Sequence, residues 1–301
     1  MNRLVETNAA QTPLEFIRPE LAVILGGNVK DGFVCEKGDV LGVITSGEQL
    51  RRRTRSAVKS AGDFSTGAAT GKIVDASKKF KAGDVLKVLT AVLQQETATV
   101  AGTIGGSGQG NAAVVITSAL LQAGSKTFAV AVANNDSAAT VAGKIRAALQ
   151  ADGAIEDHFI VSGSSTSVIL TVKEAAAYDT TLNISVDNGT CSGLTTAAAS
   201  ANTTAGNAVG ATLGTVQSIS GDDVTLTGNA SINAAAGAIV TGSDGSEVAA
   251  GIAGLGSDGD GDTSIPVYVG GYVNESLLTG LDTSAKTELG GRSTIGGVFK
   301  F

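Results

Sequence analysis

The chain contains few of the residues from which catalytic and cofactor sites are usually built. Its 301 residues include no tryptophan, one histidine, one methionine and two cysteines, and aromatic residues make up 4 % of the total. A lone histidine, His158, weighs against a multi-histidine zinc site, a haem site or a histidine-based triad. Cys35 and Cys191 are too few for a disulfide scaffold or a four-cysteine metal site. The composition therefore favours a structural protein.

Proline and long apolar runs are also scarce. Two of the three prolines, Pro13 and Pro19, fall within residues 1–22, which we predict to be an extended arm. No stretch approaches the roughly 18 apolar residues of a membrane span. The first eight residues lack the apolar region of a secretory signal. We therefore expect a soluble protein that is made inside the cell and does not contact a membrane.

Charge is sparse and unevenly distributed. The net charge is −7, with 14 basic against 11 acidic residues in 1–98 and 3 against 10 in 206–301. An acidic balance disfavours nucleic acid as a partner. The exception is a basic cluster. It is either a contact site, for phosphates or for an acidic protein surface, or a solvated loop. It consists of Arg51, Arg52, Arg53 and Arg55, with Lys59 nearby, and no aromatic residue is interleaved with it.

Glycine is abundant, with 41 residues, and it marks strand starts. The sequence Gly38–Leu41, Gly-Asp-Val-Leu, recurs at Gly83–Leu86, and a looser copy lies at Gly237–Val240. Each is a turn that leads into a β-branched or leucine run. A longer stretch of sequence similarity surrounds these copies. Together they indicate that 67–90 and 210–242 are related β segments of one barrel or sheet.

Residues 99–205 differ in composition from their flanks. Basic residues almost vanish, Ala, Thr and Ser increase, and glycine-rich stretches at 102–110 and 203–207 predict a flexible entry and exit. A helix is predicted at 137–150, capped by Asp136 or Ser137. Strands are predicted at 112–121, 126–133, 157–163, 166–173 and 182–187. A single amphipathic helix needs a sheet to cover, so this segment is predicted to be an inserted α+β module.

Both ends of the chain have β character. We predict one β-rich base domain from residues 23–98 and 206–301. Near the end, Asn274 is a candidate helix cap, and a second short helix is expected from Asp282 toward Leu289.

The motifs that suggest nucleotide or calcium binding are incomplete in this sequence. Gly105–Gly110 lacks the glycine spacing and the following helix of a dinucleotide loop, and Gly67–Lys72 is one residue short of a phosphate loop. Asp258–Asp262 has alternating carboxylates, but Thr263 and Val269 occupy the positions where a calcium loop needs Gly and Glu. A solvated acidic turn or a weak cation contact remains there. We predict no cofactor and no metal, and a structural role for His158.

Parts of the two ends resemble phage head decoration (capsid cement) proteins of the lambda-like class. The resemblance rests on Lys37–Ile44, Thr241–Val248 and, most strongly, Val267–Asn274 followed by Leu277 and Leu281; it covers about two thirds of the chain in pieces. The insert separately resembles an accessory module of phage tail and capsid proteins. Its matching segments are Asp136–Arg146 and Leu182–Leu194.

The resemblance implies a mainly β fold with an α+β insertion. The base, 23–98 with 206–301, would be a small β-barrel or β-tulip-like domain that binds the capsid, and 99–205 would protrude. Homotrimers would sit on the outer surface of the expanded capsid. The arm, 1–22, would add a strand to the major capsid protein.

We therefore predict a non-enzymatic virion protein, made in the host cytoplasm, that binds the outside of the mature phage head and stabilises it. Alternatives are a phage tail tube or baseplate protein, where the insert module also occurs, and a glycan-binding module, which the scarcity of aromatic residues disfavours. The predicted capsid-contact residues are Leu14, Phe16, Ile17, Arg18, Arg51, Arg52, Arg53 and Arg55.

Overall fold

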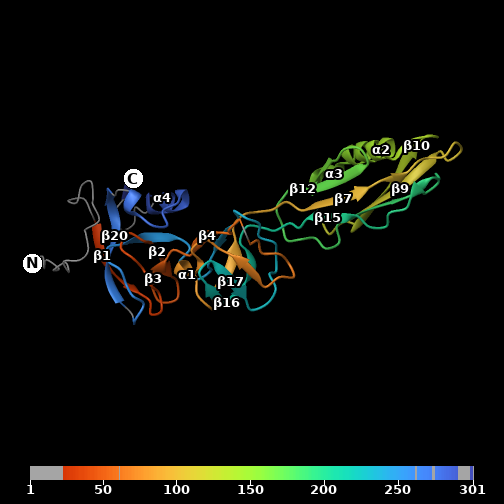
Figure 1. Ribbon diagram of the computed structural model, residues 1–301. Coiled ribbons are helices and arrows are strands. Elements are labelled where there is room, and N and C mark those ends of the chain that lie inside the picture. The colour runs from red at the N-terminus through yellow and green to blue at the C-terminus, as the bar shows by residue number, and fades with distance from the viewer. Residues whose placement is uncertain (1–22, 61, 262, 273–274, 291–298, 301) are drawn as a thin grey trace, which may run out of the picture. The chain divides into compact units, whose positions relative to one another are not determined.

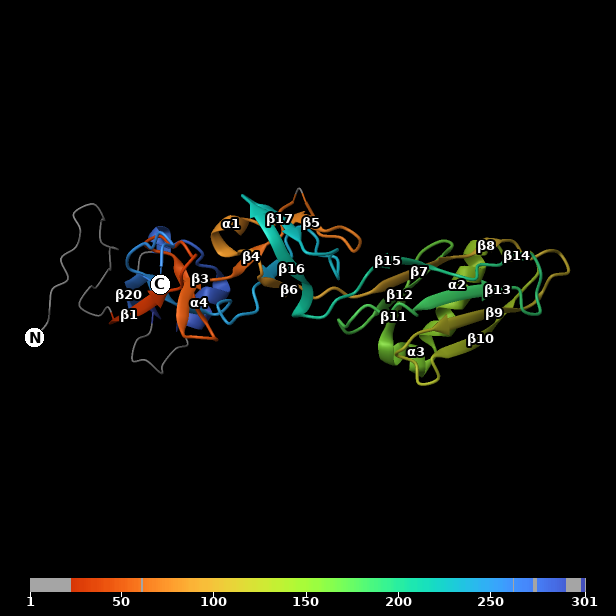
Figure 2. The ribbon, with the colours of Figure 1, turned by 90° about the horizontal axis from the view of Figure 1, so that it is seen from below.

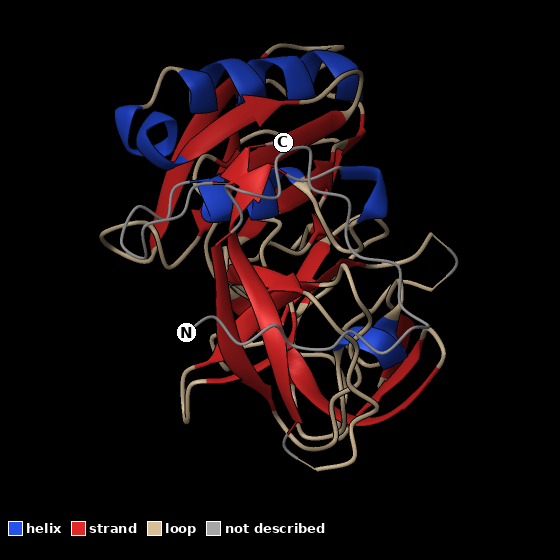
Figure 3. Ribbon diagram, turned by 90° about the vertical axis from the view of Figure 1, so that its left-hand side faces the viewer, coloured by secondary structure: helices blue, strands red, loops and turns tan. Residues whose placement is uncertain are grey.

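The structure, a computed structural model, describes residues 23–60, 62–261, 263–272, 275–290 and 299–300. The predicted arm therefore lies outside the described residues. The chain forms two compact units: unit 1 is Met1–Val88 with Thr212–Phe301, and unit 2 is Leu89–Ala211. The fold is mainly β with an α+β part between the two ends, as predicted (Figures 1 and 3).

Unit 1 contains a closed five-stranded barrel. Its strands follow the order β1-β3-β2-β19-β20, and β1 closes the barrel by pairing with β20 along its length and with β3 at Val29. The barrel core is formed by apolar residues from all these strands, among them Val29, Leu41, Leu50 and Val267. The strands are β1 (Val23–Val29), β2 (Val40–Ile44), β3 (Gln49–Arg52), β19 (Ala249–Ala253) and β20 (Thr263–Tyr272).

Short elements from the C-terminal part accompany the barrel. The two-residue strand β21 (Phe299–Lys300) pairs in parallel with β20. The 3-10 helix η2 (Glu275–Leu277) precedes α4 (Thr283–Gly290), which buries Ala285 and Leu289 against Val40 and Ile252. The expected second short helix is therefore present, and the Asp282 carboxylate caps it by accepting from the Ala285 N–H at 2.7 Å.

The second sheet of unit 1 has six strands and a separate core. Its strands come from 55–88 and 211–241, so the predicted relation between 67–90 and 210–242 as segments of one sheet is confirmed. The order is β4-β18-β6-β16-β17-β5. The elements are β4 (Arg55–Ala57), β5 (Thr70–Lys72), α1 (Ala76–Lys79), β6 (Val85–Val88), β16 (Ala211–Ser220), β17 (Asp223–Leu226) and β18 (Ile239–Thr241).

The recurring glycine motif has one backbone conformation in both sheets. Gly38, Gly83 and Gly237 have φ values of 89°, 92° and 83°, and each lies shortly before a strand, β2, β6 and β18 respectively. Residues with a Cβ rarely adopt this left-handed region, which explains the glycine at all three positions.

Unit 2 is an α+β module with a single core. Helix α2 covers the sheets through Val141, Ile145 and Leu149, and its first turn is capped by Ser137, which accepts from the Thr140 N–H. One sheet has the order β10-β9-β13, another β11-β12-β7-β15, and β14 pairs with β8 (Figure 2). The elements are β7 (Gln95–Thr99), β8 (Ala101–Gly102), β9 (Gly110–Thr117), β10 (Ser125–Val132), α2 (Ala138–Gln150), α3 (Gly153–His158), β11 (Phe159–Ser162), β12 (Ser167–Val172), β13 (Asn183–Asp187), β14 (Leu194–Thr195) and β15 (Ala201–Thr204).

The inserted unit begins earlier and ends later than 99–205. Strand β7 belongs to it because β7 pairs with β12 and β15, with Glu96 and Ala98 facing the core. The predicted exit linker contains the end of β15. Residues 153–158 form a helix, α3, and not the start of a strand, because the Asp152 carboxylate accepts from the Ile155 N–H and caps it.

The barrel requires glycine at position 42. A Cβ on Gly42 would lie 2.0 Å from the backbone oxygen of Ser246, whereas one on Gly26 would meet no atom within 4 Å. We expect Gly42→Ala to lower the free energy of unfolding by about 1–3 kcal/mol, since backbone must move to relieve the clash. Urea unfolding measures this. A loss as large in the control, Gly26→Ala, would contradict the assigned packing.

Candidate functional site

The predicted basic cluster lies inside unit 1. The arginine run (Arg51–Arg53) covers the last two residues of β3 and the residue after it, and its members are 1 %, 7 % and 3 % exposed. The interpretation of this segment as a solvated loop is therefore wrong. The physical reason is that carboxylates from distant parts of the chain surround the guanidinium groups, which allows their burial.

Arg51 has the densest set of contacts. It holds Asp84 with two hydrogen bonds of 3.1 and 2.7 Å, donates to Asp244 at 2.9 Å and donates to the Lys79 carbonyl oxygen at 2.8 Å. Its guanidinium carbon lies 4.1 Å from the centre of the Phe33 ring, a cation–π contact. Since Asp84 precedes β6 and Arg51 lies on β3, Arg51 joins the barrel to the second sheet.

The two Gly-Asp-Val-Leu copies supply equivalent carboxylates to the arginine run. The Asp84 carboxylate accepts from the Lys81 N–H at 3.0 Å, and the Asp39 carboxylate accepts from the Glu36 N–H at 2.5 Å, the same three-residue turn. Asp39 is paired with Arg52, as Asp84 is with Arg51. The repeated turn was visible in the sequence, but pairing with adjacent arginines was not predicted.

Arg53 connects the run to the C-terminal helix. Its guanidinium donates to Asp282 at 2.8 Å, to Glu288 at 2.9 Å and to the Ser284 hydroxyl at 3.0 Å. Glu288 also accepts from the Ala249 N–H on β19. The half-buried Arg55 lies farther along, with its Nε 3.4 Å from Asp282. Three consecutive arginines thus fasten the barrel, the second sheet and α4 together.

Three of the residues predicted to contact the capsid, Arg51–Arg53, use their guanidinium groups in these ion pairs and hydrogen bonds inside unit 1. A partner would have to draw the guanidinium groups of Arg51–Arg53 away from carboxylates inside the chain. The other predicted contacts, Leu14, Phe16, Ile17 and Arg18, lie outside the described residues.

The ion pairs shift the pKa values of two carboxylates. Burial alone raises the pKa of Asp244, but the Ser246 hydroxyl and Arg51 outweigh it, and the net pKa is lowered. Burial likewise acts to raise the pKa of Asp282, and the Ala285 N–H and Arg53 turn the net shift downward. Both carboxylates are therefore held in the ionised form.

A surface suited to strand pairing lies on β1. This strand pairs with β20 over all seven residues but meets β3 only at Val29. In the described part of the chain, the second edge of residues 23–28 (the β1 edge) carries no strand. Ile24 and Leu25 are 52 % and 43 % exposed. An open edge with exposed apolar side chains is typical of a site where an extended segment is added.

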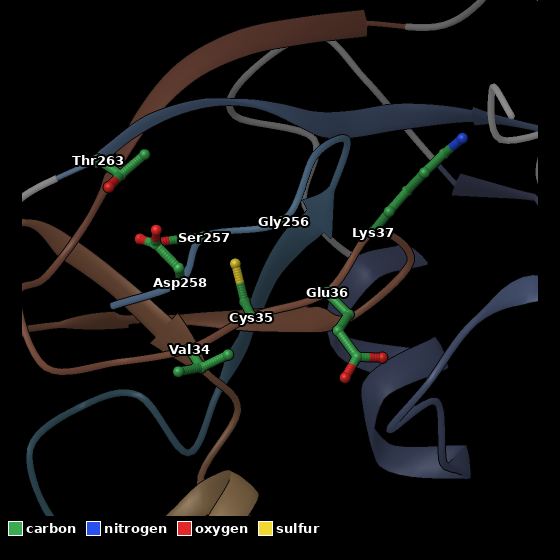
Figure 4. Close-up of a pocket in the computed structure, with 8 residues that line it drawn as sticks. All are labelled: Val34, Cys35, Glu36, Lys37, Gly256, Ser257, Asp258 and Thr263. Atoms are coloured by element: carbon green, nitrogen blue, oxygen red, sulfur yellow. The ribbon is translucent and has the colours of Figure 1, made fainter. Parts of the chain in front are cut away.

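A shallow groove of about 530 Å³ lies on the barrel between residues 34–37 on one side and residues 256–258 with Thr263 on the other. Figure 4 shows its lining, with Glu36 and Lys37 pointing in different directions. Burial raises the pKa of the Cys35 thiol, which favours the unreactive protonated form. The groove therefore presents no activated nucleophile from this residue.

The remaining candidates have local structural roles. The Asp258 carboxylate accepts from the Asp260 N–H, and Asp262 lies outside the described residues. Among the residues that the structure describes, no three His, Cys, Asp or Glu side chains gather as a metal site. His158 ends α3 and lies edge-on to Phe159. None of the described helices has the length and apolar character needed to cross a membrane.

Comparison with known proteins gives little further information. No protein-family model matches the chain, and no curated protein matches it. A solved structure from Mycobacterium phage Patience is similar over 74 % of this chain and 99 % of its own, with 15 % identity and a TM-score of 0.19. A similarity of this size carries no argument about fold or function.

The arginine run makes a direct prediction about stability. Arg51→Ala leaves Asp84 and Asp244 without their main cation, and we expect it to lower the free energy of unfolding by about 3–5 kcal/mol. The control is Lys59→Ala, which removes an exposed ion pair with Asp222 and should change stability far less. Guanidinium unfolding compares them, and equal effects would show that the Arg51 contacts do not stabilise unit 1.

The lowered pKa of Asp282 predicts acid lability. A carboxylate with a lowered folded-state pKa contributes stability above its ordinary pKa of about 4, and that stability is lost as pH falls through the folded pKa. We expect Asp282→Asn to be less stable at neutral pH and to lose less stability on acidification. Melting temperatures between about pH 7 and pH 3 test this. The exposed Asp63→Asn is the control, and parallel curves for both variants would refute the assignment.

Proposed function

We propose that this chain is a non-enzymatic structural protein of a bacteriophage, a capsid decoration protein that binds the outside of the mature head and stabilises it. It is made in the host cytoplasm and assembles on the outer surface of the capsid. Its partner is the major capsid protein, and it binds as a homotrimer.

The observation that carries the proposal is the β1 edge. Backbone N–H and C=O groups of residues 23–28 have no strand partner there within the described residues, and residues 1–22 join the barrel directly at this strand. An extended segment that leads into an open strand can pair with a sheet of another protein through its backbone. Ile24 and Leu25 would then be covered by the partner.

The construction of unit 1 supports the same proposal. The arginine run holds the barrel, the second sheet and α4 to each other, so the β1 edge is presented on a stiff base. A protein that binds the assembled lattice and not the free subunits stabilises the lattice by mass action. Many copies that each bind weakly suffice for this, because the stabilisation comes from binding alone.

The experiment is binding to expanded capsids assembled from the major capsid protein of the same phage. Deletion of residues 1–22 should abolish co-sedimentation with the capsids. Ile24→Glu should weaken it by about tenfold or more, because the charge would be buried against the partner. The control is Val209→Glu in unit 2, at a side chain that is 64 % exposed, which should bind as the wild type does.

Undiminished capsid binding by the deletion variant would overturn the role of the arm and the β1 edge. Absence of binding by the wild type itself, to expanded and unexpanded capsids alike, would overturn the decoration function.

A further inference from the structure

Unit 2 has a long and regular strand at the edge of a sheet. Strand β10 pairs with β9 over all eight of its residues, from Ser125 opposite Thr117 to Val132 opposite Gly110, without a bulge. It is the outer strand of the β10-β9-β13 sheet (Figure 2). No other strand of the described chain pairs with its second edge.

The hydrogen-bond phase fixes which residues face that edge. The Ser118 N–H donates to the Gly124 carbonyl oxygen, and antiparallel pairs alternate between bonded and non-bonded positions. The even-numbered residues of β10 therefore bond to β9. The N–H and C=O groups of Thr127, Ala129 and Ala131 point outward, and their small side chains are exposed.

This edge lacks the features that usually prevent strand pairing. Natural edges are protected by proline, bulges, short length or charged side chains. Strand β10 has eight residues, no bulge and no proline, and its charged side chain, Lys126, is already paired with Asp152 at 2.7 Å. The outward-facing backbone groups therefore match an added antiparallel strand.

We propose that the occupant is β10 of a second copy, paired antiparallel about a two-fold axis at Ala129. In this register Thr127 of each copy lies opposite Ala131 of the other, and the three outward residues exchange their backbone hydrogen bonds. Lys126 lies opposite Val132, so no like charges meet. Away from this strand, two copies of the chain repel each other electrostatically. The net charge of each is −7, and residues 99–205 carry 4 basic against 7 acidic residues.

The proposal concerns unit 2 and does not rest on the capsid function. If both hold, the contact joins neighbouring copies on a particle through a surface different from the β1 edge. The sheet formed by two copies would have six strands, counting the three strands of each.

The first test uses Ala129→Pro in the full chain. Proline is tolerated where a strand N–H faces solvent, so the β10–β9 ladder is kept while the centre of the new contact is blocked. We expect self-association to weaken by about tenfold or more from the lost hydrogen bonds, measured by sedimentation equilibrium. Ala129→Ser is the matched control and should associate as the wild type does. The melting temperature of both variants verifies folding.

The second test is cross-linking through cysteine. Residues directly opposite each other in a bonded antiparallel pair have Cα atoms about 5.5 Å apart, within the range of a disulfide. Ala129→Cys should form a covalent dimer under mild oxidation, whereas Ser162→Cys, on the exposed part of β11, should not. Background from Cys35 and Cys191 is low because both are buried.

The proposal is overturned if Ala129→Pro associates like the wild type, if the wild type does not associate through this edge, or if Ser162→Cys cross-links equally well. Capsid co-sedimentation of Ala129→Pro separates the two proposals. Normal capsid binding by Ala129→Pro with lost self-association supports both proposals. Absence of capsid binding by the wild type, with normal cross-linking through Ala129→Cys, supports the β10 contact alone.

Discussion

The structure of unit 1 depends on the burial of three consecutive arginines. A buried charge is expensive unless ion pairs and hydrogen bonds compensate for it. Here Arg51, Arg52 and Arg53 take carboxylates from the turn before β6, the turn before β2 and helix α4, respectively. These parts are far apart in the sequence, so the chain must bring both of its ends together before the charges are satisfied. The run thereby specifies one arrangement of the base.

The same interaction gives the glycine-rich composition a physical role. The Gly-Asp turns need a left-handed residue to start β2 and β6, and the following aspartates are the partners of Arg52 and Arg51. Val, Leu, Ile and Ala, together with Phe33, Phe64 and Phe80, form most of the barrel and sheet cores. A chain with few aromatic and catalytic side chains is thus organised by its backbone and by a few charges. We propose that its open strand edges, the β1 edge and β10, make its contacts with other chains.

The sequence predicted the elements with strong local signals. Residues 137–150 have helical periodicity and a capping serine, and α2 forms there, while the glycine turns mark β2, β6 and β18 correctly. Strands β7 and β15 were missed because their polar Thr, Asn and Gln residues become strands only by pairing with each other and with β12. The burial of Arg51–Arg53 was missed for a similar reason. A run of like charges reads as solvated until the distant carboxylates are placed beside it.

The most direct test of the proposed capsid decoration is a low-resolution map of the phage particle in which this chain carries a bulky fusion tag or an antibody label. We predict label density on the outer surface of the expanded head. Label density confined to the tail, or absent from the particle, would contradict it.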